Sequence, residues 1–407
     1  MKKTVLRNYA ALIARTGVNV KPGQEVIIDA EPDMPDFVYM LTEECYKAGA
    51  GKVIVNFSLE KLTKLNVKYC TDEVLGKVEK WEKERLSHYV EALPCRIYLL
   101  SEDPDGLKGI NREKYANAIQ KRSSIIKPYR DKMDNKYQWC IAAVPGAEWA
   151  RRVFPGVRTS IAIEKLWQAI LIAARATDNP TEAWAEHNKN LKERCDYLNS
   201  LKIKRLIYKS VNGTDFSVGL MKESRFLGGG EYTLSGNYYN PNIPSEEVFT
   251  SPDKNTAEGI VYSTKPLSYN GQLIENFSIK FKNGKVVETA AEKNGELLEK
   301  LIKMDKGASF LGECALISKN SPINKLGITF YNTLFDENAS CHLALGRGFT
   351  ECIADYSKYT LKECHDMGLN DSIIHEDFMI GADDLCITAE TEDGVTVPIF
   401  IDGDWAF

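Results

Sequence analysis

Along the first half of the chain, short runs of apolar residues alternate with stretches of helical spacing. The runs EVIIDA at 25–30 and KVIVNFS at 52–58 are rich in β-branched residues and follow glycine-containing turns, so they predict two buried strands. Between them, apolar residues recur at helical spacing across 35–49. A strand, a helix and a second strand in this order form a crossover, so we expect the two strands to be parallel.

The same alternation continues toward residue 145. A charged helical stretch at about 72–92 precedes the run RIYLLS at 96–101, and a second helical stretch at 111–136 precedes QWCIAAVP at 138–145. Strands that alternate with helices are typical of a doubly wound fold. We therefore predict an α/β domain with a mainly parallel sheet over residues 1–185.

Near residue 180 the pattern changes from alternation to strands and tight turns. Asp178-Asn179-Pro180 is typical of a helix start and predicts a helix over 180–201. Beyond it, turn pairs that favour β-hairpins stand among β-branched and aromatic residues: Asn212-Gly213, Asn270-Gly271, Asn283-Gly284 and Asp393-Gly394. We therefore predict a β-rich α+β domain over residues 186–407.

Composition and charge exclude several classes of partner. The chain has 407 residues, with 52 basic and 57 acidic side chains and a net charge of −5. No basic excess is available to neutralise phosphates, which argues against nucleic acid or an anionic membrane as a partner. The turn after the first strand, DAEPDMPD, lacks glycine and carries carboxylates, so it does not predict a dinucleotide site.

The cysteines and the most apolar segment indicate a cytoplasmic protein. Ten cysteines are scattered without a CxxC pair or a zinc-finger spacing, which is typical of thiols in a reducing compartment. The segment 161–176 is too short to cross a membrane and carries Glu164 and Lys165. We expect no membrane partner.

One histidine stands in a segment whose pattern suggests metal chemistry. If IIHEDFMI forms a strand, His375 and Asp377 point to the same face, where an imidazole and a carboxylate can share a divalent cation. Apolar residues on both sides suggest that the strand is buried, and a buried charged pair needs a metal or another partner. The alternative is a strand end whose His375 and Asp377 are surface groups.

Further candidate ligands lie in other apolar segments. His342 stands among small and apolar residues and, taken alone, is typical of a core histidine. Glu337 precedes it by five residues, and Glu313 is a carboxylate inside an apolar run, where unpaired glutamates are rare. Glu247 follows a turn-rich stretch, and its neighbour Glu246 should face the opposite way in an extended chain.

The remaining helical histidines look uninvolved. His88 follows a run of charged residues and His187 stands in AWAEHNKN, so both are predicted to be solvated helix positions.

Two histidines with three or four carboxylates favour Zn²⁺, Co²⁺ or Mn²⁺ over copper or a thiolate zinc site. The carboxylates outnumber the ligands of one tetrahedral zinc, whereas two cations ~3.5–4 Å apart with a bridging carboxylate would use them all. The residue types alone predict metal-assisted hydrolysis, without indicating a substrate.

Four motifs carry a family resemblance. In order, SEEVFTSP, LGECALI, DENASCHLALG and IHEDFMIG resemble the thermophilic aminopeptidase (leucyl aminopeptidase T and aminopeptidase S) family of dinuclear metallo-aminopeptidases, and the likeness extends over essentially the whole chain. The resemblance implies a cytosolic exopeptidase that removes N-terminal residues from peptides. It also implies two divalent cations (Zn, Co, Mn or Mg), an α/β N-terminal domain, a β-rich catalytic domain and a homodimer.

Carried over by position, the family's metal ligands fall on residues that all have the expected identity: Glu247, Glu313, His342, His375 and Asp377. Glu337 matches a further acidic position near the metals, and the resemblance leaves open whether Glu313 or Asp377 bridges. One position departs from the family, which usually has a tyrosine seven residues after the first metal histidine. Here that position is Phe349.

Three hypotheses about function follow. The first is a metallo-aminopeptidase in which Glu313, Glu337 or Glu246 transfers the proton to the leaving amine. The second is a metal- or peptide-binding homologue with little hydrolysis, because Phe349 replaces the tyrosine. The third is a metallohydrolase for another amide or ester.

Under each of these hypotheses, Cys314 and Cys341 are predicted to be buried thiols that do not bind metal, since strand neighbours of a ligand face away from it.

Overall fold

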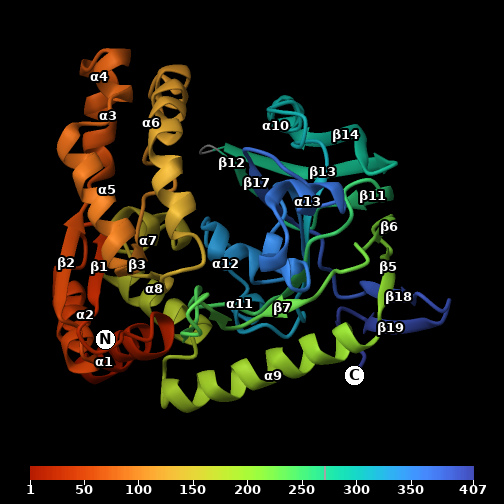
Figure 1. The fold of residues 1–407 in the computed structure, drawn as a ribbon, viewed down its shortest axis with the longest axis horizontal. Helices are drawn as coiled ribbons and strands as arrows, with labels where there is room; N and C mark the ends of the chain where they lie inside the picture. Colours follow the sequence, from red (N-terminus) through yellow and green to blue (C-terminus); the bar gives the residue numbers. More distant parts are fainter. Residues whose placement is uncertain (270–271) are drawn as a thin grey trace. The chain divides into compact units, whose positions relative to one another are not determined.

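The computed structural model describes residues 1–269 and 272–407 (Figure 1). The described chain divides into two compact units, one formed by residues 1–185 and 230–244 and the other by residues 186–229 and 245–407. The division into domains at 185/186 that the sequence suggested stays a prediction.

A four-stranded sheet in the order β2-β1-β3-β4 forms the centre of the first unit. All three of its strand pairs are parallel, which confirms the predicted crossovers. Its strands are β1 (Glu25–Ala30), β2 (Lys52–Phe57), β3 (Cys95–Leu100) and β4 (Trp139–Ala143). A short pair, β8 (Glu231–Tyr232) with β9 (Tyr238–Tyr239), belongs to the same unit.

Helices surround this sheet. They are α1 (Lys3–Leu12), the π-helix η1 (Ile13–Gly17), α2 (Pro35–Ala48), α3 (Glu60–Tyr69), α4 (Asp72–Gly76), α5 (Lys80–Ala92), α6 (Arg112–Met133), α7 (Ala147–Val153) and α8 (Thr159–Ala173). On β1, Ile27 packs with Tyr89 of α5 and Met133 of α6. Helices α1, α2 and α8 instead meet through the rings of Tyr9, Phe37 and Trp167.

The charged stretch at 72–92 is two helices, whereas the sequence suggested one helical stretch. Lys77 leaves the helical conformation with φ −75° and ψ 140°, which ends α4. Glu79 then starts α5 through a capping box, in which its side chain and that of Glu82 accept each other's backbone N–H groups. This capping box is hard to recognise in the sequence, because its two glutamates stand among other lysines and glutamates.

The second unit begins with most of α9 (Pro180–Ser200), a helix predicted at nearly these bounds. A nine-stranded antiparallel sheet follows, in the order β12-β13-β11-β6-β5-β18-β19-β20, with β14 paired to β13. Its strands are β5 (Ile203–Lys209), β6 (Asp215–Gly219), β11 (Glu258–Tyr262), β12 (Leu267–Tyr269), β13 (Gln272–Lys282), β14 (Lys285–Lys293), β18 (Cys386–Thr391), β19 (Thr396–Ile401) and β20 (Asp404–Trp405).

A five-stranded antiparallel sheet in the order β17-β16-β15-β10-β7 completes this unit. Its strands are β7 (Leu227–Gly228), β10 (Val248–Thr250), β15 (Leu311–Leu316), β16 (His342–Gly346) and β17 (His375–Met379). The accompanying helices are α10 (Gly295–Leu301), α11 (Pro322–Lys325), α12 (Thr333–Glu337), α13 (Leu361–Asp366) and the 3₁₀ turns η2 (Thr350–Cys352) and η3 (Tyr356–Lys358).

One hydrophobic core joins the two sheets of the second unit. Leu343 and Leu345 of β16 and Phe378 of β17 pack in it with Tyr208 of β5 and Ile387 of β18. Because side chains alternate along a strand, the residues between these apolar ones lie on the other face of the five-stranded sheet. That face is therefore free to carry polar groups.

The turn predictions agree with the strands that the structure describes. Asn212-Gly213 joins β5 to β6, Asn283-Gly284 joins β13 to β14, and Asp393-Gly394 joins β18 to β19. Asn283 and Gly284 both have positive φ, as a two-residue hairpin turn requires. The predicted turn at Asn270-Gly271 lies outside the described residues. Within the described chain, no helix is both long and apolar enough to cross a membrane.

Candidate metal centre

The polar face of the five-stranded sheet gathers the predicted ligands in adjacent rows. His375 and Asp377 alternate on β17 with the core residue Phe378, and Asp377 pairs with Ala344 of β16. Ala344 in turn pairs with Glu313 of β15, so the small Ala344 side chain separates two carboxylates in one row. Side chains opposite one another in antiparallel strands have Cβ atoms only ~4.5–5.5 Å apart. The row therefore lets the carboxylates of Glu313 and Asp377 converge.

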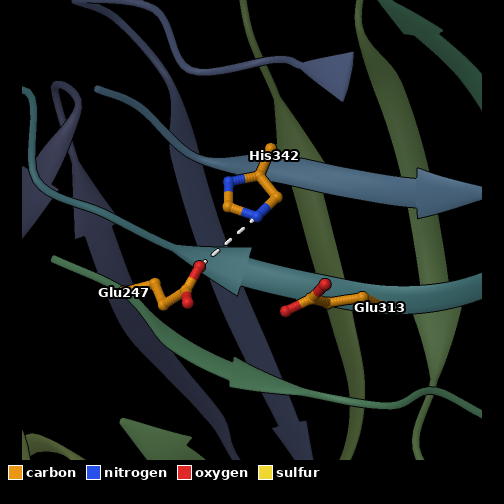
Figure 2. Close-up of side chains that lie close together, drawn as sticks. All are labelled: Glu247, Glu313 and His342. Atoms are coloured by element: carbon orange, nitrogen blue, oxygen red, sulfur yellow. Dashed lines mark ion pairs between the residues drawn. The ribbon is translucent and has the colours of Figure 1, made fainter. Parts of the chain in front are cut away.

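The two histidines turn their Nε2 atoms toward these carboxylates. His375 Nε2 lies 3.0 Å from Glu313 Oε2 and 3.4 Å from Asp377 Oδ1. His342 Nε2 lies 3.6 Å from Glu247 Oε2 and 3.9 Å from Asp377 Oδ1. Figure 2 shows Glu247, Glu313 and His342 pointing toward one another from three neighbouring segments of the sheet. The structure thus brings together five residues that are up to 130 positions apart in the sequence.

Backbone carbonyls hold the other nitrogen of each imidazole. His375 Nδ1 lies 2.7 Å from the carbonyl oxygen of Arg347, and His342 Nδ1 lies 3.1 Å from that of Glu337. A nitrogen that faces a carbonyl oxygen carries the proton, which leaves Nε2 of a neutral imidazole with a lone pair. Metal-binding histidines are oriented in this way.

The charges of the cluster strongly perturb its protonation. Burial, together with the carboxylates of Asp377, Glu247 and Glu313, raises the pKa of Glu337 well above its usual value. Burial opposes the charged form of His375, but Asp377 and Glu313 outweigh it and raise the pKa of this imidazole well above its usual value. Burial likewise opposes the ionised form of Asp377, yet the imidazoles of His375 and His342 lower the pKa of its carboxyl. Several buried negative charges here need protons or cations to balance them.

The donor set fits divalent cations. Two groups of three residues, Glu247–Glu313–His342 and Glu313–His375–Asp377, have ligand atoms that lie within 4.8 Å of one another. The two groups share Glu313. Asp377 Oδ1 is buried and has no hydrogen-bond partner among the described residues, which is the state expected of an oxygen reserved for a cation. Imidazole nitrogen with carboxylate oxygen suits zinc, cobalt or manganese.

Phe349 lies directly beside this cluster. Its ring centroid is 4.8 Å from that of His375 and 5.7 Å from that of Phe249, and its backbone N–H donates to Ser251 Oγ at 2.8 Å. The position at which the family resemblance places a tyrosine is therefore next to a predicted ligand, and its side chain has no hydrogen-bond donor.

The two cysteines next to predicted ligands are buried, as the sequence predicted. Cys314 and Cys341 belong to the hydrophobic core between the sheets. The Sγ of Cys341 exchanges hydrogen bonds with the backbone N–H and carbonyl of Ile317, both at 3.3 Å, and burial raises the pKa of its thiol to about 12. Neither sulfur belongs to a described group of converging ligand atoms.

One prediction about a histidine is wrong. His187 is not a solvated helix residue, because only 6% of its surface is exposed and its Nε2 lies 2.6 Å from the carbonyl oxygen of Ser245. By contrast, the side chain of His88 is half exposed, as predicted. The polar residues around His187 in AWAEHNKN gave no signal of burial, because a helix covered by a distant loop keeps a polar sequence where that loop supplies hydrogen-bond partners.

The comparison with family models decides what kind of protein carries this cluster. The model of the thermophilic metalloprotease (M29) family matches residues 2–405. The chain belongs to this family. The match confirms the family resemblance that the sequence motifs indicated. Membership of a metalloprotease family implies divalent metal as a cofactor.

Relatives and a solved structure support the family over the whole length. Aminopeptidase AmpS of Bacillus subtilis is 39% identical over 404 residues, covering 99% of this chain and 98% of that protein. Aminopeptidase T of Thermus thermophilus is 35% identical over 405 residues with the same coverage. The solved structure of wild-type AmpT from Thermus thermophilus matches 100% of both chains with a TM-score of 0.92, which also confirms the fold class. The M29 chain described here is accordingly a metallo-aminopeptidase.

A second solved structure shares the fold alone. 2,5-Dihydroxypyridine dioxygenase from Pseudomonas putida matches 99% of this chain and 96% of that protein with a TM-score of 0.52, at 12% identity.

Proposed function

We propose that this M29 protein removes N-terminal residues from peptides with two divalent cations bound on the polar face of its five-stranded sheet. The observation that carries the proposal is the pair of converging ligand groups that share Glu313. Glu247 and His342 would complete one cation site, and His375 and Asp377 the other. A residue common to both groups is the natural bridging carboxylate, which favours Glu313 over Asp377 in that role.

Divalent cations held in this way supply Lewis-acid polarisation of the scissile carbonyl and lower the pKa of water. The protein's own residues would orient the ligands and transfer protons. The carbonyls of Arg347 and Glu337 fix the imidazoles of His375 and His342. If Glu313 is committed to both cations, Glu337 and Glu246 are left as the carboxylates that move the proton to the leaving amine. Glu337 Oε1 already accepts a hydrogen bond, from Asn338 Nδ2 at 3.4 Å.

The second hypothesis, a binding protein with little hydrolysis, is favoured by one observation. Phe349 lies against His375 and offers no hydroxyl to a developing oxyanion. One such donor is typically worth ~10²–10³ in turnover, so its lack predicts a slower enzyme. The cations would remain, and we therefore propose reduced hydrolysis rather than none.

We further propose a cytoplasmic homodimer. The free thiols of all ten cysteines support a reducing compartment. The dimer follows from the family likeness alone and is checked by sedimentation or light scattering of the purified protein.

A panel of amino-acyl chromogenic anilides tests the proposed function. The protein is stripped of metal with a chelator and assayed before and after the addition of Zn²⁺, Co²⁺, Mn²⁺ or Mg²⁺. The matched controls are the same anilides with an acetylated α-amine. Metal-dependent cleavage of the free-amine substrates alone is expected. Equal cleavage of the acetylated controls would indicate a different amidase, and metal binding without turnover would indicate the binding protein.

A further inference from the structure

A buried peptide group lies one residue before the predicted ligand Glu247. It joins Ser245 to Glu246, and both residues are less than a tenth exposed. Its carbonyl oxygen lies 2.6 Å from Nε2 of His187 on α9. Its N–H donates to Oδ1 of Asn338, at the end of α12, at 2.7 Å.

These two contacts act on opposite ends of the same peptide plane. In a trans peptide the carbonyl oxygen and the amide hydrogen point in opposite directions, so His187 and Asn338 hold the group from two sides. The His187 nitrogen that faces a carbonyl is a donor, and the Asn338 oxygen that faces an N–H is an acceptor. A plane held at both ends cannot rotate without breaking a buried hydrogen bond, which restricts the backbone that leads into Glu247.

Asn338 also connects this peptide to a second predicted site residue. Its side chain is fully buried, and its Nδ2 donates to the carbonyl of Leu334 at 2.9 Å and to Glu337 Oε1 at 3.4 Å. The backbone carbonyl of Asn338 accepts a hydrogen bond from Ser321 Oγ at 2.8 Å. The oxygen and the nitrogen of the amide therefore have different, fixed partners. One side chain links the segment of Glu247 to the helix end that carries Glu337.

The backbone of Glu247 is approached closely from a third direction. A Cβ atom on Gly228 of β7 would lie 2.5 Å from the carbonyl oxygen of Glu247, so a residue with a side chain would displace the segment. Gly228 pairs with Val248, the first residue of β10. The backbone is thus held on both sides of Glu247, by the Ser245–Glu246 peptide one residue before it and by the strand that begins one residue after it.

We propose that His187 and Asn338 are positioning residues that set the affinity of the site for its cations by holding the Ser245–Glu246 peptide, and with it Glu247, in place. The proposal rests on the proposed function, because it assumes that Glu247 is a ligand. Neither side chain is itself a candidate ligand. Partners that orient metal ligands typically change metal affinity or activity ~10–100-fold when they are replaced.

The experiment measures metal affinity rather than activity. Apo-protein is titrated with Co²⁺ in competition with a chromophoric chelator, well below the melting temperature of each variant, and circular dichroism confirms the fold. His187→Leu and Asn338→Leu remove the hydrogen bonds at similar volume. His187→Gln is the matched variant, because its amide can still donate to the Ser245 carbonyl.

Thr391→Val controls for loss of a buried hydrogen bond elsewhere in the same unit. Within the β18–β19 hairpin, Thr391 Oγ1 accepts the N–H of Val395 at 3.1 Å, and its hydroxyl faces Asp393 Oδ1 and, at 3.0 Å, the carbonyl oxygen of Val395. Thr391→Val should lower the melting temperature and leave the cobalt affinity unchanged.

We expect the Co²⁺ dissociation constant to rise at least about tenfold in His187→Leu and Asn338→Leu, and by less than about threefold in His187→Gln. Unchanged affinity in folded His187→Leu and Asn338→Leu would overturn the proposal, as would equal losses in His187→Gln and His187→Leu. If Asn338→Leu does not fold, the two His187 variants decide the question. Failure of the unaltered protein to bind cobalt at all is a different outcome, which overturns the proposed function itself.

Discussion

Both units gather carboxylates, and among the described residues only the gathering in the second unit brings ligand atoms together with imidazole nitrogens. In the first unit the strand-end cluster, defined as Glu31, Glu60, Glu102 and Asp103, lies where β1 and β3 end side by side. In the second unit the histidine cluster consists of Glu247, Glu313, Glu337, His342, His375 and Asp377. Among the described residues, the groups of converging ligand atoms belong to the histidine cluster alone.

The difference lies in how the two sheets present side chains. Helices cover both faces of a parallel sheet, so polar groups gather where its strands end, and the strand-end carboxylates accordingly come from loops and a helix start. They repel one another: burial, with Glu31, Asp103 and Glu102, raises the pKa of Glu60 to about 7. Antiparallel rows instead place Glu313 and Asp377 on one face, with imidazoles between the carboxylates. Among the described residues, converging carboxylates occur together with imidazole nitrogens only in the histidine cluster, a donor set that suits zinc, cobalt or manganese.

Removing one proposed ligand should largely abolish metal binding by the histidine cluster. His375→Ala or Asp377→Ala is expected to lose one bound metal and nearly all hydrolysis, because the two residues form one edge of the site and share it with Glu313. Elemental analysis of the purified variants, combined with the anilide assay, measures both effects. Unchanged metal content in both variants would contradict the ligand assignment.

A milder change tests a residue beside the two converging groups. Glu337→Ala is expected to lower metal affinity or turnover ~10–100-fold, as for a group that supports the ligands from outside. Glu337→Gln keeps the volume and serves as the matched variant. A loss as large as that of Asp377→Ala would instead make Glu337 a ligand in its own right.

Adding one hydroxyl beside the histidine cluster should raise the rate of hydrolysis. Phe349→Tyr is expected to raise the turnover rate at least about tenfold with metal content unchanged, because a phenol beside His375 can donate to a developing oxyanion. The comparison variant is Phe249→Tyr, which adds a hydroxyl to the neighbouring ring that packs against Phe349. If a folded, metal-loaded Phe349→Tyr protein shows the original rate, the missing tyrosine is not what limits this enzyme.

The smallest effect is expected at the strand-end cluster. The pKa of Glu60 is raised from near 4.5 to about 7, so between these pH values the folded protein keeps a proton that the unfolded chain has lost. Stability contributed by this protonated carboxyl falls as the pH rises through that window, and above pH 7 the ionised group is a net penalty. Glu60→Gln should therefore stabilise the protein at pH 8 by about 1 kcal/mol, a figure reduced for solvent screening, and have little effect near pH 4.5.

Chemical denaturation at the two pH values measures this effect, with Glu91→Gln on the exposed surface of α5 as the control. Chelation of metal should not change the result. Equal stabilisation at both pH values would contradict the electrostatic explanation.

Local sequence was sufficient for the strands of the first unit and for three hairpins of the second. The strands β1 to β4 follow from apolar runs, and the hairpin turns follow from Asn-Gly and Asp-Gly pairs, because both signals depend on neighbouring residues alone. The relation between His375 and Asp377 was also predictable, since residues two apart on any strand share a face. The family motifs then supplied the other predicted ligands by position, without indicating the distances between them.

Only the tertiary structure decided which carboxylates converge and what holds them. Glu247 reaches His342 because β10 pairs with β15 and β15 with β16, a strand order that no local pattern encodes. His187 looked solvated because its partner, the Ser245 carbonyl, is 58 residues away in the chain. Asn338 gave no signal at all, because an amide is equally at home in a turn or in a core. Burial and hydrogen-bond partners are properties of the assembled fold, and they decided the geometry on which the proposed chemistry depends.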